Sequence, residues 1–288
     1  MTISSIGTGG TYTTIQAWED ACPANITAAG TNEDWIGELK NQEFLLSSTL
    51  TVSGMTTDST HRVILRCQTG ASFRDNASKA TNNLTYNSGY GACVKLNVGY
   101  VSLANLNSKH VSLLNTMFMS VYNNAIFSGA VNLIIDSCIA VCNSVFDTFN
   151  LGASIKNSVF RTGSINIDSG TTNYNNTYIA KTSGSYRYAY PWYGGGSTFT
   201  NCLFLGYQDY TASHGYTMNN CGTTGTFANC TATSCITGLT AANEIVAPAF
   251  GDSTVANMDA KLKSGASSIG SGTSSGAPSV DIIGQARS

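Results

Sequence analysis

A repeat of about 20 residues in the middle of the chain constrains the fold more than any other feature of this sequence. Six segments share an apolar residue, a polar residue two positions later, a small residue directly after it, and an apolar residue two positions further on. The polar residues of the six segments are Asn115, Asp136, Asn157, Asn176, Asn201 and Asn229. They follow one another after 21, 21, 19, 25 and 28 residues, a period that indicates a solenoid with one turn per repeat.

The residue types of the repeat predict how one turn is built. Apolar side chains at equivalent strand positions point inward and stack on those of the turns above and below. Asparagine at a sharp corner tolerates the left-handed backbone conformation, and stacked asparagine side chains can bond to each other as a ladder. We therefore predict an all-β protein that forms a parallel β-solenoid, with the six polar residues as a ladder at one corner. A β-propeller or a β-sandwich fits less well, because propeller blades need about 40 residues and sandwiches show hairpin-turn signals.

The low charge of the chain agrees with such a coil. Only 10% of the residues are charged, and 14 Lys and Arg stand against 16 Asp and Glu, which leaves a net charge of −2. The chain therefore lacks the excess of basic residues that is typical of nucleic-acid-binding proteins. No apolar run reaches the roughly 18 residues that a membrane-spanning helix needs. We expect neither a nucleic acid nor a membrane as a partner.

The nine cysteines are expected to be reduced thiols. The N-terminus lacks the basic and apolar regions of a secretory signal, which predicts folding in a cytosol, where disulfides are rare. Reduced cysteines then pack as small apolar side chains. The three histidines, His61, His110 and His214, are scattered along the chain, so the sequence predicts no metal site and no cofactor.

One helix is predicted near the N-terminus, over residues 11–22. Thr13 and Gln16 would form a capping box, and Ile15 and Trp18 would form the apolar face. The open end of a solenoid exposes strand edges that need cover. We therefore expect this helix to cap the first turn.

The chain divides into three parts on these grounds. Residues 1–60 would hold the cap and the first coil, and residues 61–250 the parallel β-helix. Residues 251–288 form a C-terminal segment that becomes rich in serine and glycine from about residue 264. Such a composition indicates a tail along the solenoid or a linker.

An aromatic stretch between Asn176 and Asn201 is not explained by the coil. The longer spacing predicts a projecting loop, and Tyr, Trp and Arg are enriched where proteins bind each other. The same residue types stack on sugar rings, so a protein partner, a glycan, and burial against the solenoid itself are the three alternatives. The candidate interaction surface consists of Tyr186, Arg187, Tyr188, Tyr190, Trp192, Tyr193, Tyr207 and Tyr210.

No catalytic group is predicted. Polysaccharide-cleaving solenoids use paired carboxylates on one lateral face. Between residues 76 and 243 the chain has only four carboxylates, namely Asp136, Asp147, Asp168 and Asp209, and nothing in the sequence selects a pair. We therefore expect a protein that is not an enzyme.

Several segments resemble a known family. The stretch TGGTYTTIQAWEDACP at 8–23 is followed by IVAPAF at 245–250, MDAKLKSGASSIGSGT at 258–273 and VDIIGQAR at 280–287. Together with the repeat, they resemble the right-handed parallel β-helix proteins of the pectin-lyase-like superfold, in particular those of tailed bacteriophages and prophages. The resemblance implies a right-handed coil, and it carries more weight for fold than for function.

The same resemblance implies a structural virion protein, assembled in the host cytoplasm. Such a protein would decorate or cement the capsid surface and would bind the major capsid protein or other virion proteins. By analogy it could form a homo-oligomer, a trimer above all. The main alternative is a tail fibre or tailspike protein that binds a receptor or depolymerises a polysaccharide. A bacterial adhesin-like module is the third possibility, which the missing export signal disfavours.

Overall fold

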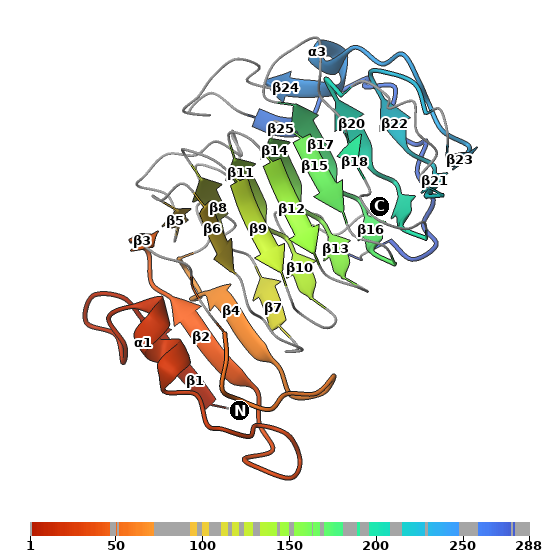
Figure 1. Ribbon diagram of the computed structural model, residues 1–288. Helices are drawn as coiled ribbons and strands as arrows, with labels where there is room; N and C mark the ends of the chain where they lie inside the picture. The colour runs from red at the N-terminus through yellow and green to blue at the C-terminus, as the bar shows by residue number, and fades with distance from the viewer. Residues whose placement is uncertain are drawn as a thin grey trace.

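The structure is a computed structural model of the chain. It describes residues 2–46, 50, 52–71, 93–96, 100–103, 111–114, 117–120, 124–128, 133–142, 145–149, 153–162, 164–167, 170–180, 189–190, 196–207, 215–227, 230–247, 259–277 and 279. In this part of the chain nearly all regular structure is β-strand, and the strands form three all-parallel sheets and one small hairpin (Figure 1).

The largest sheet has ten strands. In chain order they are β1 (Thr2–Ile6), β2 (Trp35–Leu39), β4 (Val63–Cys67), β7 (Val111–Leu114), β10 (Ile134–Asp136), β13 (Ser154–Lys156), β16 (Thr172–Tyr174), β19 (Thr198–Thr200), β21 (Thr217–Asn219) and β23 (Thr231–Thr233). Each strand pairs with the equivalent strand of the previous and the next turn. This order is that of a coil that returns to the same sheet once per turn.

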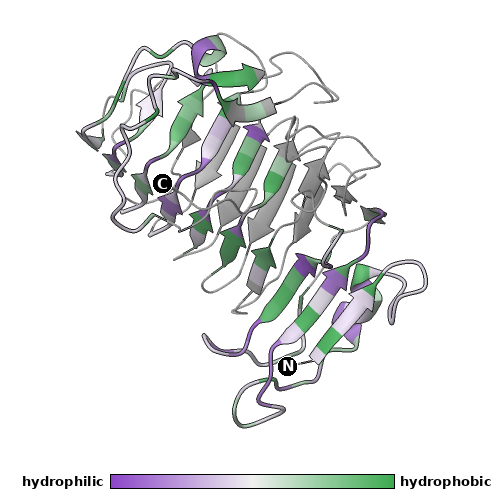
Figure 2. Cartoon of the chain, turned by 180° about the vertical axis from the view of Figure 1, so that it is seen from behind, coloured by the Kyte–Doolittle hydropathy of each residue, from purple (hydrophilic) through white to green (hydrophobic). Residues whose placement is uncertain are grey.

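Two further sheets complete the turns. The eight-stranded sheet holds β3 (Glu43–Leu46), β5 (Cys93–Leu96), β8 (Met117–Ser120), β11 (Ile139–Cys142), β14 (Val159–Thr162), β17 (Thr177–Ala180), β20 (Leu203–Leu205) and β22 (Gly222–Thr223). The five-stranded sheet holds β6 (Tyr100–Leu103), β9 (Asn124–Ser128), β12 (Val145–Phe149), β15 (Ser164–Ile167) and β18 (Ala189–Tyr190). The fold is thus all-β and solenoid-like, consistent with a parallel β-helix. In Figure 2, most apolar residues lie on these strands, and hydrophilic residues are more frequent at strand ends and in connecting segments.

The inner face of the ten-stranded sheet corrects the predicted alignment by one residue. The inward column, in register from turn to turn, consists of Leu65, Leu113, Ile135, Ile155, Asn173, Phe199 and Met218, each at most 3% exposed. The repeat pattern places Ile134 and Tyr174 in this column, but both are half-buried neighbours on the other face. A shift of one residue along a strand moves a side chain to the opposite face.

In strands β14, β17 and β20, the eight-stranded sheet is buried on both faces. Its inner face carries Phe160, Tyr178 and Phe204, whose rings stack with centroids 5.1 and 4.9 Å apart. On the opposite face Ile139 and Ile179 are also buried, although the repeat assigns them to the inner column. Parallel sheets covered on both sides have nearly continuous apolar strands, so the apolar pattern alone does not distinguish the two faces here.

A corner of left-handed residues follows the ten-stranded sheet in successive turns. Its members have φ between 50° and 57° and are Ser137, Asn157, Asn175, Asn201, Asn220 and Ser234. We call this set the corner column. Asparagine adopts this backbone conformation more readily than most residues, because its short side chain can bond to the nearby backbone.

Helix α1 (Ile15–Asp20) packs against the first turns, and it is shorter than predicted. Its N-cap is Thr14, not Thr13, because the Thr14 hydroxyl accepts the N–H of Ala17 at 3.1 Å. Gln16 donates forward to Glu19 and Asp20 instead of back to the cap. Ile15 and Trp18 are buried, and the Trp18 ring stacks on Trp35 with centroids 6.4 Å apart.

The last described elements lie beyond the coil. Helix α3 (Ala241–Glu244) leads into β24 (Ile245–Ala247), which pairs antiparallel with β25 (Asp259–Leu262). These elements lie near the C-terminal end of the coil, where β20 and β22 are the last strands of the eight-stranded sheet (Figure 1). The segment that follows them, residues 266–276, runs along the coil, and we call it the strap.

Candidate functional site

The residues directly after the corner column form a second column, which we call the inner ladder. Its members are Cys138, Ser158, Asn176, Cys202, Cys221 and Cys235. Their side chains accept backbone N–H groups of the turn before: Ser158 Oγ from Cys138 N at 3.1 Å, and Asn176 Oδ1 from Ser158 N at 2.9 Å. The sulfurs of Cys221 and Cys235 do the same at 3.4 Å. The inner ladder therefore satisfies backbone donors at the bend, where no strand pairing is available.

The corner column carries the contacts between the coil and the strap. Asn201 forms a two-way amide pair with Thr273, because its Nδ2 donates to the carbonyl oxygen at 2.7 Å and its Oδ1 accepts the N–H at 2.8 Å. Asn220, one turn later, donates to the carbonyl oxygen of Ser271 at 3.1 Å. The strap thus runs back along the coil, opposite to the order of the turns. Gly276 follows this path and lies against the Tyr174 ring, where a Cβ atom would come within 3.1 Å.

The buried Glu244 anchors the start of the strap. Its carboxylate accepts the N–H groups of Ser267 and Ser268 at 3.2 and 3.0 Å. Lys263, just before the strap, donates to the carbonyl oxygen of Ala242. A carboxylate that accepts backbone N–H groups forms charge-assisted bonds, which are stronger than neutral ones.

Four of the six residues predicted for the asparagine ladder are described, and they fall at three kinds of position. Asn157 and Asn201 belong to the corner column, with φ of 50° and 55°. Asp136 lies one residue before the corner, paired with Lys156, and Asn176 lies one residue after it in the inner ladder. These two placements correct the predicted alignment by one residue. Asn115 and Asn229 lie outside the described residues.

Four residues of the corner column were missed by the repeat alignment, and the sequence contains a signal for one of them. Asn220 follows Asn201 by 19 residues and stands between Met218 and Cys221, the apolar and small residues of the pattern. The alignment passes over it to Asn229. Asn175 precedes Asn176, and two adjacent asparagines cannot be told apart by residue type.

The predicted aromatic interaction surface is only partly described. Tyr207 does not belong to it, because its side chain is 3% exposed and packs in the core. Its hydroxyl donates to the carbonyl oxygen of Ile179 at 3.3 Å, so this ring is an internal contact of the coil. Tyr190 ends strand β18, so part of the expected loop belongs to the five-stranded sheet. Tyr186, Arg187, Tyr188, Trp192, Tyr193 and Tyr210 lie outside the described residues.

The carboxylates considered for catalysis are described only in part. Asp136 pairs with Lys156 at 3.3 Å across neighbouring turns. Asp147 lies on β12, where only the backbone is described, and Asp168 and Asp209 lie outside the described residues. Within the described ranges, no group of three His, Cys, Asp or Glu residues is arranged to hold a metal ion.

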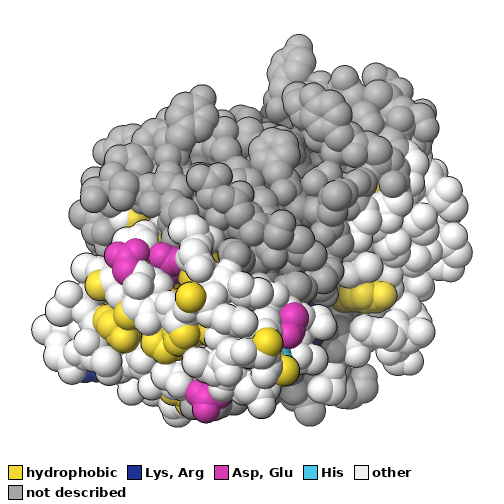
Figure 3. Space-filling model, turned by 60° about the horizontal axis from the view of Figure 1, so that its bottom comes forward, with side chains coloured by type: hydrophobic (Ala, Val, Ile, Leu, Met, Phe, Trp, Pro, Cys, Tyr) yellow, Lys and Arg dark blue, Asp and Glu magenta, His cyan; other side chains and the backbone are white. Residues whose placement is uncertain are grey.

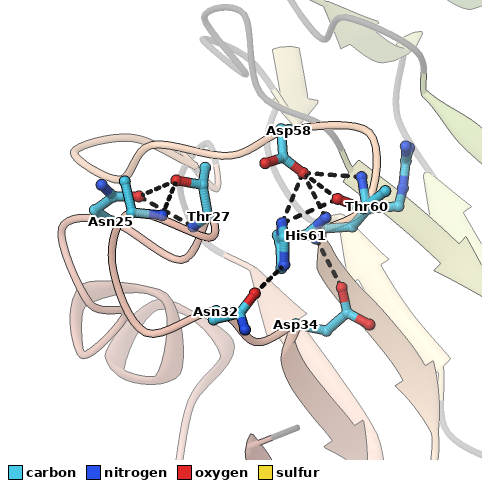
Figure 4. A network of polar contacts seen from close by, with 9 residues as sticks. Asn25, Thr27, Asn32, Asp34, Asp58, Thr60 and His61 are labelled. Atoms are coloured by element: carbon cyan, nitrogen blue, oxygen red, sulfur yellow. Dashed lines mark hydrogen bonds and ion pairs between the residues drawn. The ribbon is translucent and has the colours of Figure 1, made fainter.

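A polar network ties together two loops near the N-terminus (Figure 4). One oxygen of Asp58 accepts from the backbone and hydroxyl of Thr60 and from the backbone and Nδ1 of His61, all within 2.9 Å. The Nε2 of His61 lies 2.9 Å from Oδ1 of Asn32 in the other loop. Both ring nitrogens of His61 thus lie within hydrogen-bond distance of an oxygen of a neighbouring side chain.

This network makes a testable prediction about acid stability. Burial acts to raise the pKa of Asp58, but the hydrogen bonds from Thr60 and His61 outweigh it and hold the pKa well below its usual value. A carboxylate with a lowered folded-state pKa stabilises the fold above its unfolded pKa of about 3.9, and this contribution is lost as pH falls through the folded value. We expect the protection of residues 56–62 against hydrogen exchange, measured relative to the unstructured chain at the same pH, to fall below about pH 4.

Asp58→Asn is the matched variant for this measurement. In this variant the protection of residues 56–62 should no longer fall on acidification, because an amide does not titrate in this range. Equal acid dependence in both proteins would show that another group controls the stability of this loop.

Acidic side chains near the N-terminus are separated rather than gathered. On the face that Figure 3 brings forward, acidic side chains stand in small separate groups among uncharged ones. Glu38 pairs with Arg66 at 2.6 Å, and Asp34 accepts the backbone N–H of Arg62. Glu33 accepts from the Thr2 hydroxyl. These carboxylates thus bond to residues of the first turns.

Seven of the nine cysteines have described side chains, and these seven are free thiols, four of them buried. Burial raises the pKa of Cys22 to about 12, with a further contribution from Glu19. Burial is the largest cause of the raised thiol pKa of Cys221. For Cys235, the largest cause of the raised pKa is its hydrogen bond with Cys221. A protonated, buried thiol reacts slowly, since the thiolate is the nucleophile.

We therefore expect alkylation of Cys22, Cys202 and Cys221 by iodoacetamide to be at least about tenfold slower in the folded than in the unfolded chain at pH 7.5. Mass spectrometry of the labelled peptides measures this site by site. Rapid labelling of Cys221 in the folded chain would mean that the last turns open readily.

No family model matches the chain, and no curated protein and no solved structure is similar enough to count as a match. Among the described helices, none is long and apolar enough to cross a membrane.

Proposed function

We propose that the protein is a structural component of a tailed bacteriophage particle that decorates or cements the head surface. The observation that carries the proposal is the coil itself, in which polar side chains at the bends bond to the coil's own backbone and its own strap. In this proposal the coil is right-handed and α1 caps its first turn. The protein acts as a rigid binding element, and we expect no catalytic activity.

The packing of the coil supports a role that requires resistance to unfolding and proteolysis. Long parallel sheets, stacked rings and bonded bends leave few segments that open without disrupting neighbouring turns. Proteases cut chains that open locally, so such a rod is expected to resist degradation outside the cell. The resemblance of several segments to β-helix proteins of tailed phages supports the same role.

The proposed partners are the major capsid protein or other virion proteins, with a glycan as the ligand in the alternative role. The aromatic residues that the repeat leaves unexplained, from Tyr186 to Tyr193, are the proposed contact surface. Tyr and Trp supply large contact areas at low entropic cost, which suits an interface. The protein would be assembled into the particle in the host cytoplasm.

The test is the copy number of this protein in purified particles, measured by peptide mass spectrometry relative to the major capsid protein. Hundreds of copies per particle are expected for a head decoration protein. A handful of copies would contradict that role and favour the tail alternative, for which a polysaccharide-cleavage assay is the next measurement. Complete absence from particles would overturn the structural role.

A further inference from the structure

The hydrogen bonds that link the strap to the rest of the described chain share one property, which is that they involve only the main chain of the strap. Asn201 binds the N–H and carbonyl of Thr273, Asn220 binds the carbonyl of Ser271, and Glu244 binds two N–H groups. Every peptide unit offers such groups. The coil therefore binds the main chain of the strap at a fixed place, and these hydrogen bonds do not depend on the side chains of the strap.

Space, rather than side-chain chemistry, sets the residue type where the strap lies closest. A Cβ atom on Gly272 would lie 3.2 Å from Oδ1 of Asn201, so a side chain here would press on the amide that binds Thr273. The corner column thus fits a segment of small residues. The strap sequence ASSIGSGTSSG at 266–276 is of this kind and carries no charge.

The strap is also lightly held. Only Ala266 among its residues is buried, and Ile269 is 54% exposed. A few hydrogen bonds and one buried methyl group barely offset the entropy lost on ordering such a chain. The column is not completely filled either, because the Nδ2 of Asn175 is buried without a hydrogen-bond partner in the described part of the chain. Local opening of the strap is therefore expected to be frequent.

We propose that the strap is exchangeable between copies, so that the corner column of one copy binds residues 266–276 of a second copy. The column makes the same main-chain bonds with either strap, so the competition is decided by local concentration. This inference rests on the proposed function in one respect, since copies side by side on a particle favour exchange. Exchanged straps would link neighbouring copies without any further interface.

Two full-length variants test the exchange by complementation. Asn201→Ala with Asn220→Ala removes the column's amides and leaves the strap intact. Thr273→Pro removes the N–H that Asn201 accepts and leaves the column intact. Each variant alone should be monomeric. A mixture of the two at about 1 mM, the order of the effective concentration of a segment on a short linker, should form 1:1 dimers in light scattering. Circular dichroism verifies that both are folded.

The matched control is Asn243→Ala, which removes an exposed asparagine on α3 outside the column. When mixed with Asn201→Ala/Asn220→Ala, it should form no more mixed dimer than the wild type does. In the double variant, hydrogen exchange in residues 267–276 should be at least about tenfold faster than in the control.

Two outcomes would overturn the proposal. One is a mixture that stays monomeric although the double variant shows the faster hydrogen exchange. The strap would then open without binding to a second copy. The other is dimerisation of either variant alone to the same extent as the mixture, because another interface is then responsible. These measurements use purified protein and particle copy number does not enter them, so this inference and the proposed function can fail separately.

Discussion

Replacing Tyr178 by alanine is expected to lower the free energy of unfolding by about 3–5 kcal/mol, the usual range for a buried aromatic residue. Tyr178 is fully buried, and its ring lies between Phe160 and Phe204 in stacked contact. The truncation would leave a cavity in the centre of three successive turns. Chemical denaturation followed by far-ultraviolet circular dichroism measures the loss.

Tyr178→Phe separates the ring from the hydroxyl group. The hydroxyl donates to Oδ1 of Asn173 at 2.9 Å and accepts from Nδ2 of Asn176 at 3.3 Å. Phenylalanine keeps the stacking and leaves the Asn173 oxygen without this donor, a change that costs about 1–3 kcal/mol. If both variants lose the same stability, the hydroxyl network and not the aromatic stack holds these turns.

Replacing Trp18 by alanine is expected to cost about 3–5 kcal/mol. Its ring occupies the space that Gly37 leaves open on β2, where a Cβ atom would lie 2.7 Å from the indole. Trp18 also accepts a hydrogen bond at its carbonyl oxygen from the Trp35 indole at 3.2 Å. The loss of this ring would detach α1 from the first turns. Thermal unfolding of the variant measures the effect.

Gly37→Ala provides the matched test of this packing. Alone it should destabilise by about 1–3 kcal/mol, because the added methyl group meets the rigid Trp18 ring at 2.7 Å. It also meets the end of the Ile6 side chain at 2.6 Å, which can turn into the space that Trp18→Ala leaves. In the Trp18→Ala background the ring is gone, so the same substitution should cost much less. The two sites therefore form a double-mutant cycle with a non-zero coupling. Additive effects would mean that Trp18 and Gly37 do not share this space in solution.

The elements that local pattern determines were predicted well, and those that depend on register were not. The repeat predicts parallel strands stacked turn on turn, and the three parallel sheets confirm a solenoid-like fold. Ile15 and Trp18 are buried as expected of the helix. However, Asn173 and not Tyr174 points inward, because its amide is bonded to Tyr178 inside the core. A polar residue that is buried because it bonds to another buried side chain cannot be recognised by hydropathy.

The aromatic residues illustrate the same limit. Tyr207 was predicted to contact a partner because it stands in a tyrosine-rich stretch. In the structure its hydroxyl lies 3.3 Å from the carbonyl oxygen of Ile179, one turn earlier, and the ring is buried. Residue type predicts that a tyrosine needs a polar partner for its hydroxyl, but not whether that partner belongs to the same chain.

By itself, the sequence determined the period of the coil, its parallel strands and the use of asparagine at the bends. These features depend on residues that are close together in the chain and repeat with it. The tertiary structure alone decided the register of the columns and the path of the strap. Asn201 and Thr273 are 72 residues apart, and Asn220 and Ser271 are 51 apart. The asparagine side chains bond to main-chain groups of the strap. Such bonds cannot be predicted from the residue types of the strap, because every peptide unit carries the same donor and acceptor.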